Sequence, residues 1–228
     1  MKKSINTILK HTSQDKTNKS ANPAVVRAST ILFESMQELA AHEKKVLKGK
    51  KITHYSYGRY GSQTTIELEN IIKELEQAYH VFLTGTGFGG ISLALMSLCR
   101  PGDEILVSDN VYGPTREITE DLLKEFNINA KFYNPENFDD LKNKATKKTK
   151  MILVENPGSN TFEFQDLKKI IKFEKIRNII TLLDNTWGTP LYLKPLKIGF
   201  DMSFCSATKY LSGHSDAMGG TLSVNKKV

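Results

Sequence analysis

Three polar segments of this 228-residue chain border hydrophobic stretches, and their residue types could do chemistry together. Lys209 follows the stretch 202–207, and Asp184 closes the stretch 178–184. The third is a glycine-rich segment, Thr84–Gly90, between a hydrophobic stretch and an apolar helical stretch. Because the carboxyl ends of parallel strands share one edge of a sheet, where ligands bind, we expect the amine and the carboxylate to face one crevice beside the glycines.

The segment Thr84–Gly90 predicts a phosphate site, because glycines allow close backbone approach and a helix N-terminus supplies N–H groups. A plain glycine-rich turn explains the same residues. A dinucleotide-binding turn is a third reading: G-x-G-x-x-G is present at Gly85, Gly87 and Gly90. Asp109 closes the next predicted strand, near where a ribose-binding acid would lie. That reading leaves the polar strand ends of the second half unexplained.

The lysine, the carboxylate and the phosphate site together form the set that pyridoxal 5'-phosphate (PLP) needs. An amine forms an imine with the cofactor aldehyde, and a carboxylate keeps the pyridine nitrogen protonated so that the ring accepts electrons. The hydroxyl groups of Ser206 and Thr208 flank Lys209 and can reach the phosphate. Simpler readings exist, since Asp184 can cap a helix, Lys209 can be a surface lysine and Tyr112 can be a core aromatic. The conjunction of these residues at strand ends favours PLP.

Hydrophobic stretches alternate with amphipathic ones from residue 63 onward, which predicts an α/β fold. Strands that are apolar throughout indicate a mostly parallel sheet covered on both faces. Helices are expected near 34–48, 63–79, 91–99, 116–126, 138–146 and 164–176. Strands are expected near 81–85, 104–108, 130–134, 151–155, 178–184, 202–207 and 219–224.

Composition excludes several other classes. The net charge is +7, but the lysines are spread along the chain and arginine is scarce, so we expect no nucleic-acid partner. Cys99 and Cys205 stand alone and the five histidines form no metal-binding pair, so no metal site or disulfide is expected. No secretory leader or membrane-spanning stretch is recognised, and a cytoplasmic location is expected.

Residues 1–22 are polar and are expected to form a poorly ordered leader. We divide the chain into an N-terminal extension, residues 1–60, and a cofactor-binding large domain, residues 61–228. The sequence ends straight after a strand, so we expect a piece of a longer protein, with a natural short chain as the alternative.

The segment Ser206-Ala-Thr-Lys-Tyr-Leu-Ser-Gly-His-Ser-Asp-Ala-Met-Gly-Gly220 resembles the PLP-attachment motif of the cystathionine β-lyase and γ-synthase family, the Cys/Met metabolism PLP enzymes. The similarity runs from about Tyr55 to the end. It implies an aspartate-aminotransferase-like (fold type I) large domain with a seven-stranded sheet whose last strand is antiparallel. It implies these roles: Lys209 for the Schiff base, Asp184 for the pyridine nitrogen, Tyr112 for stacking on the ring, and Gly87, Phe88, Ser206 and Thr208 for the phosphate.

The resemblance also implies a homo-oligomer with shared sites, a dimer and in full length a tetramer. Tyr57 and Arg59, in Tyr-Gly-Arg-Tyr-Gly, match a pair that reaches the phosphate in the neighbouring subunit. The family's C-terminal domain supplies an arginine for the substrate carboxylate, and we expect that domain to be missing from this chain.

Within the family, Asp184-Asn-Thr-Trp187 and Glu155–Glu163 resemble the β-eliminating enzymes, although Ser159 replaces the usual Asn. The implied reaction is β-elimination on a small amino acid, with Lys209 or Tyr57 as the base; cystathionine would give homocysteine, pyruvate and ammonia. A γ-elimination or γ-replacement, a nicotinamide-binding module and an inactive PLP-binding fragment remain open.

Overall fold

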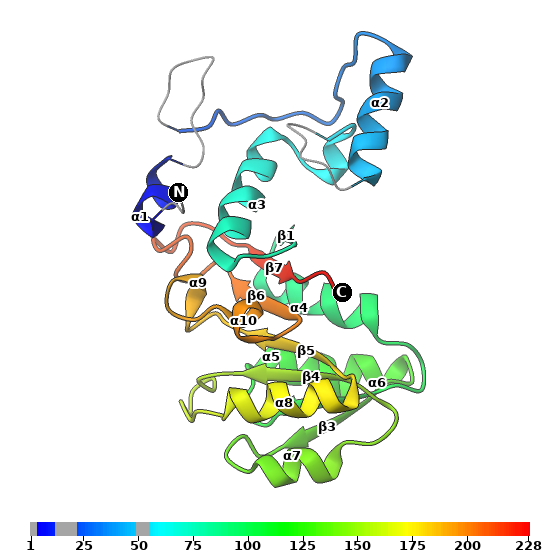
Figure 1. Cartoon of the computed structure of the whole chain (residues 1–228), viewed down its shortest axis with the longest axis vertical. Helices are drawn as coiled ribbons and strands as arrows, with labels where there is room; N and C mark the ends of the chain where they lie inside the picture. Colours follow the sequence, from blue (N-terminus) through cyan, green and yellow to red (C-terminus); the bar gives the residue numbers. More distant parts are fainter. Residues whose placement is uncertain (1–3, 12–21, 49–54) are drawn as a thin grey trace. The chain divides into compact units, whose positions relative to one another are not determined.

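The computed structural model of the chain describes residues 4–11, 22–48 and 55–228. The chain divides into two compact units, Met1–Glu74 and Leu75–Val228, which are described one at a time. Figure 1 labels most of the helices and strands of both.

The first unit contains a helix that the sequence did not predict. Helix α1 (Ile5–His11) lies within the stretch that we expected to be a poorly ordered leader. The Ser4 hydroxyl accepts a hydrogen bond from the backbone of Thr7 at 3.2 Å, as a helix-capping residue does. The remainder of that stretch, residues 1–3 and 12–21, lies outside the described residues.

Helix α2 (Met36–Leu47) begins after a reciprocal cap. Ser35 Oγ accepts from the backbone of Glu38, and the Glu38 carboxylate accepts from the backbone of Glu34. A short 3-10 turn, η1 (Gly58–Tyr60), follows, and α3 (Gln63–Glu76) carries the chain into the second unit.

The second unit is built on a seven-stranded sheet of order β1-β7-β6-β5-β4-β2-β3. The last strand, β7, runs antiparallel to β1 and β6 on either side of it, and the other strands share one direction, so the predicted fold class is confirmed, including the direction of the last strand. The strands are β1 (His80–Thr84), β2 (Glu104–Ser108), β3 (Asn129–Tyr133), β4 (Thr149–Glu155), β5 (Ile180–Asp184), β6 (Met202–Ser206) and β7 (Gly220–Val224).

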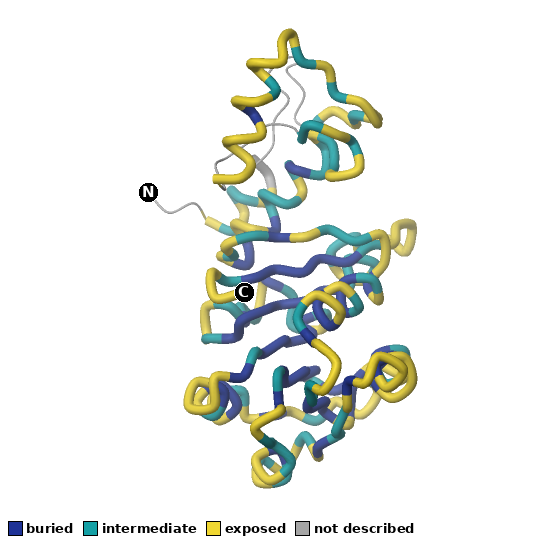
Figure 2. The backbone as a smooth tube through the Cα atoms, turned by 90° about the vertical axis from the view of Figure 1, so that its right-hand side faces the viewer, coloured by how far each residue is buried: buried dark blue, intermediate teal, exposed yellow. Residues whose placement is uncertain are grey.

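Both faces of the central part of this sheet are covered, which explains why β2, β4, β5 and β6 are largely apolar (Figure 2). Ile105 and Val107 of β2 pack in one cluster, while Leu106 between them packs in the other. Helix α4 (Gly87–Leu98) covers the first face with the helical segment α5 (Gly113–Glu117), η2 (Ile118–Leu122) and α6 (Leu123–Glu125). Helices α7 (Phe138–Lys144) and α8 (Leu167–Arg177) cover the second.

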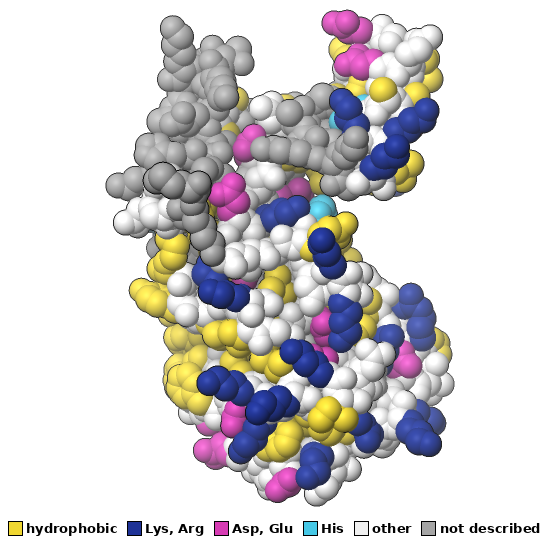
Figure 3. All heavy atoms as spheres, in the orientation of Figure 1, with side chains coloured by type: hydrophobic (Ala, Val, Ile, Leu, Met, Phe, Trp, Pro, Cys, Tyr) yellow, Lys and Arg dark blue, Asp and Glu magenta, His cyan; other side chains and the backbone are white. Residues whose placement is uncertain are grey.

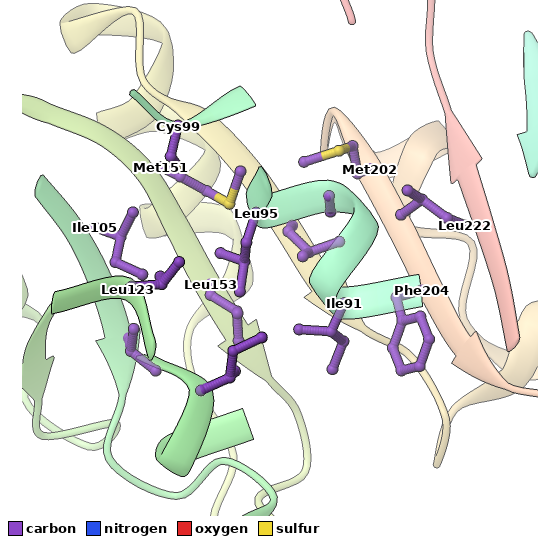
Figure 4. Close-up of a cluster of buried hydrophobic side chains, with 14 of the residues drawn as sticks. Ile91, Leu95, Cys99, Ile105, Leu123, Met151, Leu153, Met202, Phe204 and Leu222 are labelled. Carbon is purple, nitrogen blue, oxygen red and sulfur yellow. The ribbon is translucent and has the colours of Figure 1, made fainter. Parts of the chain in front are cut away.

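Helix α4 connects the core to the glycine segment. Ile91 and Leu95 of this helix lie in the same buried cluster as Phe204 (Figure 4). Each such fully buried aliphatic side chain contributes roughly 1.5–3 kcal/mol. The core therefore fixes the helix axis, and with it the position of the helix N-terminus.

Several helix boundaries differ from the predicted ones. Helix α4 begins at Gly87, four residues earlier than expected, so the glycines form its first turn. The helical segment expected at 116–126 begins at Gly113 and contains a π-turn at Ile118–Leu122. Two short helices that were not predicted, α9 (Thr189–Tyr192) and α10 (Pro195–Ile198), lie between β5 and β6.

Basic side chains are spread over the face shown in Figure 3, with acidic ones among them, rather than gathered into one stripe. Within the described ranges, no helix is long and apolar enough to cross a membrane.

Candidate active site

Polar residues gather in the second unit at the carboxyl edge of the sheet, where β1, β2, β4, β5 and β6 end. A cavity of about 1230 Å³ lies there. It brings together seven of the nine residues for which sequence analysis predicted a site role: Gly87, Phe88, Tyr112, Asp184, Ser206, Thr208 and Lys209.

Asp184 ends β5 as a buried carboxylate, only 6% exposed. Its Oδ1 accepts a hydrogen bond from the backbone of Thr186 at 3.0 Å. Burial raises the pKa of Asp184 to about 6, and the contacts with Thr186 oppose that rise. Thr186 Oγ1 also accepts from the backbone of Ser206 at 2.9 Å, which ties the ends of β5 and β6 together.

Lys209 lies in a tight turn directly after β6. Its backbone N–H donates to Ser206 O at 3.1 Å, and its carbonyl accepts from Gly213 N at 2.8 Å. The side chain is exposed and lines the cavity, and no ion pair joins it to another residue of the described chain. The amine and the buried carboxylate therefore share one cavity, each without an ionic partner within the described ranges.

The N-terminus of α4 forms the next wall. Thr86 caps the helix by accepting from Gly89 N at 3.0 Å. Because Gly87 and Phe88 begin the helix, their N–H groups have no intrahelical partners. A Cβ on Gly87 would lie 2.6 Å from Ser206 Oγ, so the absence of a side chain there lets the serine approach the helix end. Backbone N–H groups, a hydroxyl and the helix dipole suit a phosphate.

Thr208 and Tyr112 line the same cavity, and hydrogen bonds hold the Thr208 side chain. The Thr208 hydroxyl exchanges hydrogen bonds with the backbone of Gly219, donating to its carbonyl at 3.3 Å and accepting from its N–H at 3.1 Å. Tyr112 is half exposed and immediately precedes α5.

Sequence analysis missed Glu155 as a site residue. It ends β4, pairs in register with Asp184, is 5% exposed and lines the cavity. Its Oε2 accepts from the backbone N–H of Tyr112 at 2.7 Å. Burial and the Asp184 charge raise the pKa of Glu155 to about 8. The available signal was that two neighbouring strands, 151–155 and 178–184, both end in an acid.

An aromatic wall borders the cavity on another side. Trp187, the single tryptophan of the chain, lines the cavity and is 40% exposed. Its ring centroid lies 5.1 Å from that of Phe162 and 6.1 Å from that of Tyr210. Ser159 also lines the cavity, where its backbone N–H donates to Asn110 O at 2.8 Å.

Tyr57 and Arg59 lie in the first unit. The Arg59 guanidinium donates to Tyr60 OH at 3.0 Å and lies 5.7 Å from the Tyr57 ring centroid. Gly58 between them donates to Ser29 O at 2.8 Å, and a Cβ there would come within 2.2 Å of a backbone oxygen. The local structure holds the pair together, and their reach to a cofactor stays a prediction.

The acid that the dinucleotide-binding hypothesis requires, Asp109, already has a partner. Asp109 forms an ion pair with Arg116, whose guanidinium also donates to Glu120 at 2.7 Å. The carboxylate expected at a ribose is thus engaged on the surface.

The residues present fit PLP. A buried carboxylate without a cation suits a protonated pyridine nitrogen, the helix end with Ser206 suits a phosphate, and Lys209 supplies the amine.

Comparison with known proteins decides the family. The model of the Cys/Met metabolism PLP-dependent enzymes matches residues 6–228. The chain belongs to this family. Its cofactor is accordingly PLP, as the sequence predicted.

A cystathionine β-lyase of Bordetella avium is 35% identical over 228 residues, covering 98% of this chain and 57% of that protein. A Campylobacter jejuni structure, described as an O-acetylhomoserine (thiol)-lyase, contains N'-pyridoxyl-lysine-5'-monophosphate. It matches with a TM-score of 0.89 and 26% identity, covering 98% of this chain and 54% of that one. The chain thus spans about half the length of these relatives.

Relatives within the same family carry other activities. An L-alanine/L-glutamate racemase of Wolbachia pipientis is 33% identical, covering 89% of this chain and 51% of that protein. An L-methionine γ-lyase of Fusobacterium nucleatum is 32% identical, covering 90% and 51%. Family membership therefore establishes the PLP cofactor and leaves the reaction and its substrate to be proposed.

Proposed function

We propose that this chain is the cofactor-holding part of a PLP-dependent carbon–sulfur β-lyase that cleaves cystathionine in the formation of methionine. The observation that carries the proposal is the single cavity that joins the Lys209 amine, the buried Asp184 carboxylate and the N-terminus of α4. The 35% identity with a cystathionine β-lyase supports the choice of reaction.

In this proposal each group has a defined task toward the cofactor. Lys209 would hold its aldehyde carbon and Asp184 its pyridine nitrogen. Ser206, Thr208 and the N–H groups of Gly87 and Phe88 would hold its phosphate. Tyr112 would stack on its ring.

Bound PLP would supply an electron sink for negative charge that develops at the substrate Cα. Lys209 Nζ, or the hydroxyl of Tyr57, would take the proton from Cα. The negative charge of Asp184 would keep a proton on the pyridine nitrogen, which would matter most once electrons leave Cα. The thiolate would then depart from Cβ, and cystathionine with one water molecule would yield homocysteine, pyruvate and ammonia.

Product analysis tests the reaction. Purified protein is incubated with PLP and cystathionine, with Lys209→Ala as the matched control. Pyruvate that depends on Lys209 supports β-elimination. A sister reaction of the family would instead give 2-oxobutyrate by γ-elimination, and its appearance without pyruvate would replace the proposal.

We further propose that sites are shared between subunits of a homodimer, itself part of a tetramer, in a reducing compartment such as the cytoplasm. The planar guanidinium of Arg59 suits a phosphate, which supports the shared site. Both cysteines are buried free thiols, which supports the reducing compartment. Mixing Arg59→Ala with Lys209→Ala protein tests the sharing. With subunit exchange confirmed, activity should recover in part, because one site of each mixed dimer is intact. Exchange without recovery rules out shared sites.

A further inference from the structure

Glu155 and Asp184 form a pair of buried carboxyl groups at the cavity. They end the neighbouring strands β4 and β5 and lie opposite each other in parallel register. Both are about 95% buried, and neither forms an ion pair with a described residue. The other charged side chains that line the cavity are Lys209 and Asp216.

The Glu155 carboxyl group holds Tyr112 in place. Its Oε2 accepts from Tyr112 N at 2.7 Å. The Tyr112 side chain makes no capping hydrogen bond to α5, the helix that follows. The backbone of Glu155 is fixed in turn: its N–H donates to Ser108 Oγ at 3.1 Å, and its carbonyl accepts from Gln165 Nε2 at 2.9 Å. The point from which the Tyr112 ring enters the cavity therefore depends on this side chain.

The two carboxyl groups differ in how well their anions are stabilised. Adjacent buried carboxylates repel each other, and one of them tends to retain a proton. Asp184 accepts from Thr186 N at 3.0 Å beside the Thr186 hydroxyl, which favours its anion. Burial and the neighbouring Asp184 charge raise the pKa of Glu155 to about 8, and the hydrogen bond from Tyr112 N opposes this rise without cancelling it. Glu155 is therefore the member that keeps the proton at neutral pH.

We propose that Glu155 is a positioning residue: in neutral form it fixes Tyr112 through the backbone N–H and leaves the negative charge of the pair on Asp184. This inference rests on the proposed PLP site and adds a residue to it. A neutral Glu155 would let one carboxylate, at one defined position, face the cationic nitrogen of the cofactor.

Measuring PLP binding tests the positioning role of Glu155 separately from its protonation state. Trp187 lines the cavity and is the single tryptophan, so quenching of its fluorescence reports binding to the 228-residue chain. Glu155→Ala removes the hydrogen-bond acceptor and should weaken PLP affinity about three- to tenfold. Glu155→Gln keeps an acceptor oxygen and neutrality, so it should stay within about twofold of the wild type. Equal weakening in both variants, or none in Glu155→Ala, would overturn the positioning role.

Infrared spectroscopy of the cofactor-free protein tests the proton directly. At neutral pH the wild type should show the C=O stretch of protonated carboxyl groups, and Glu155→Gln should remove the component that Glu155 contributes, while buried Glu76, whose pKa burial raises to about 7, keeps its own. Glu117→Gln, at an exposed site, should leave the band unchanged. A band of unchanged intensity in Glu155→Gln contradicts the inference even when Glu155→Ala folds poorly. Failure of wild-type protein to bind PLP would count against the proposed function and would leave the infrared result intact.

Discussion

The second unit holds two pairs of buried carboxyl groups, one near each end of β5, and only one pair has a cation. At the amino end, Lys227 Nζ lies 3.3 Å from Glu174 Oε2 and 3.1 Å from Asp201 Oδ2. Both acids are at most 3% exposed, and Asp201 also accepts from the backbone of Thr181 at 3.0 Å. At the carboxyl end, Glu155 and Asp184 have no cationic partner within the described ranges.

The difference shows how one strand can serve stability at one end and binding at the other. Glu174 and Asp201 share the single cation of Lys227, which anchors the segment after β7. Burial without a cation is costly, so the Glu155–Asp184 pair stores an unfavourable interaction that a cationic ligand can relieve. The pair without an internal cation is the one that faces the cavity.

The largest effect, on turnover, is expected from removing the negative charge of Asp184 in the pair at the cavity. Asp184→Asn should lower turnover about 10²- to 10³-fold, because the lost charge acts where negative charge develops. PLP affinity, followed by Trp187 fluorescence, should fall much less, since the phosphate and lysine contacts remain. Steady-state kinetics beside a fluorescence titration checks the split. Normal turnover in Asp184→Asn would move the electron-sink role to another residue.

At the other end of β5, removing the cation should destabilise the fold. Lys227→Met leaves Glu174 and Asp201 buried without a positive partner, and we expect the free energy of unfolding to fall by about 2–4 kcal/mol. Urea denaturation measures it, with Lys147→Met as a control at an exposed lysine. PLP binding at 25 °C should stay unchanged in both variants. Equal stability of the two variants would show that Lys227 contributes little.

The smallest effect concerns pH. The pKa of Glu155 rises to about 8 in the folded chain from 4.5, so between these values the unfolded chain binds fewer protons. The free energy of unfolding should therefore fall as pH rises from about 5 to about 8. Glu155→Gln should flatten this fall, and near pH 8 its free energy of unfolding should exceed that of the wild type by about 1–2 kcal/mol. Denaturation of cofactor-free protein at several pH values, with Glu117→Gln alongside, measures the slope. Parallel curves for Glu155→Gln and the wild type would contradict the assignment.

The strands could be predicted because burial on both faces leaves an unbroken apolar signal, as in β2 and β5. The start of α4 could not, because Gly87, Gly89 and Gly90 have low helix propensity and tertiary packing overrides it. The π-turn at Ile118–Leu122 leaves no comparable mark in the sequence.

Site residues divide in the same way. Lys209 and Asp184 stand at the ends of strands and could be assigned from chemistry and edge rules. Glu155 reads as the last residue of an apolar strand, and its partner becomes visible only from the register of β4 with β5. The link from Glu155 to Tyr112 spans 43 residues and depends on the folded loop.

The central claim is that Lys209 carries PLP in the cavity at the carboxyl edge of the sheet. Borohydride reduction of the PLP-loaded chain, followed by peptide mapping, tests it most directly. The account requires the pyridoxyl label on Lys209 and its loss, together with the yellow colour, in Lys209→Ala. A label on another lysine, or undiminished labelling of Lys209→Ala, would contradict it.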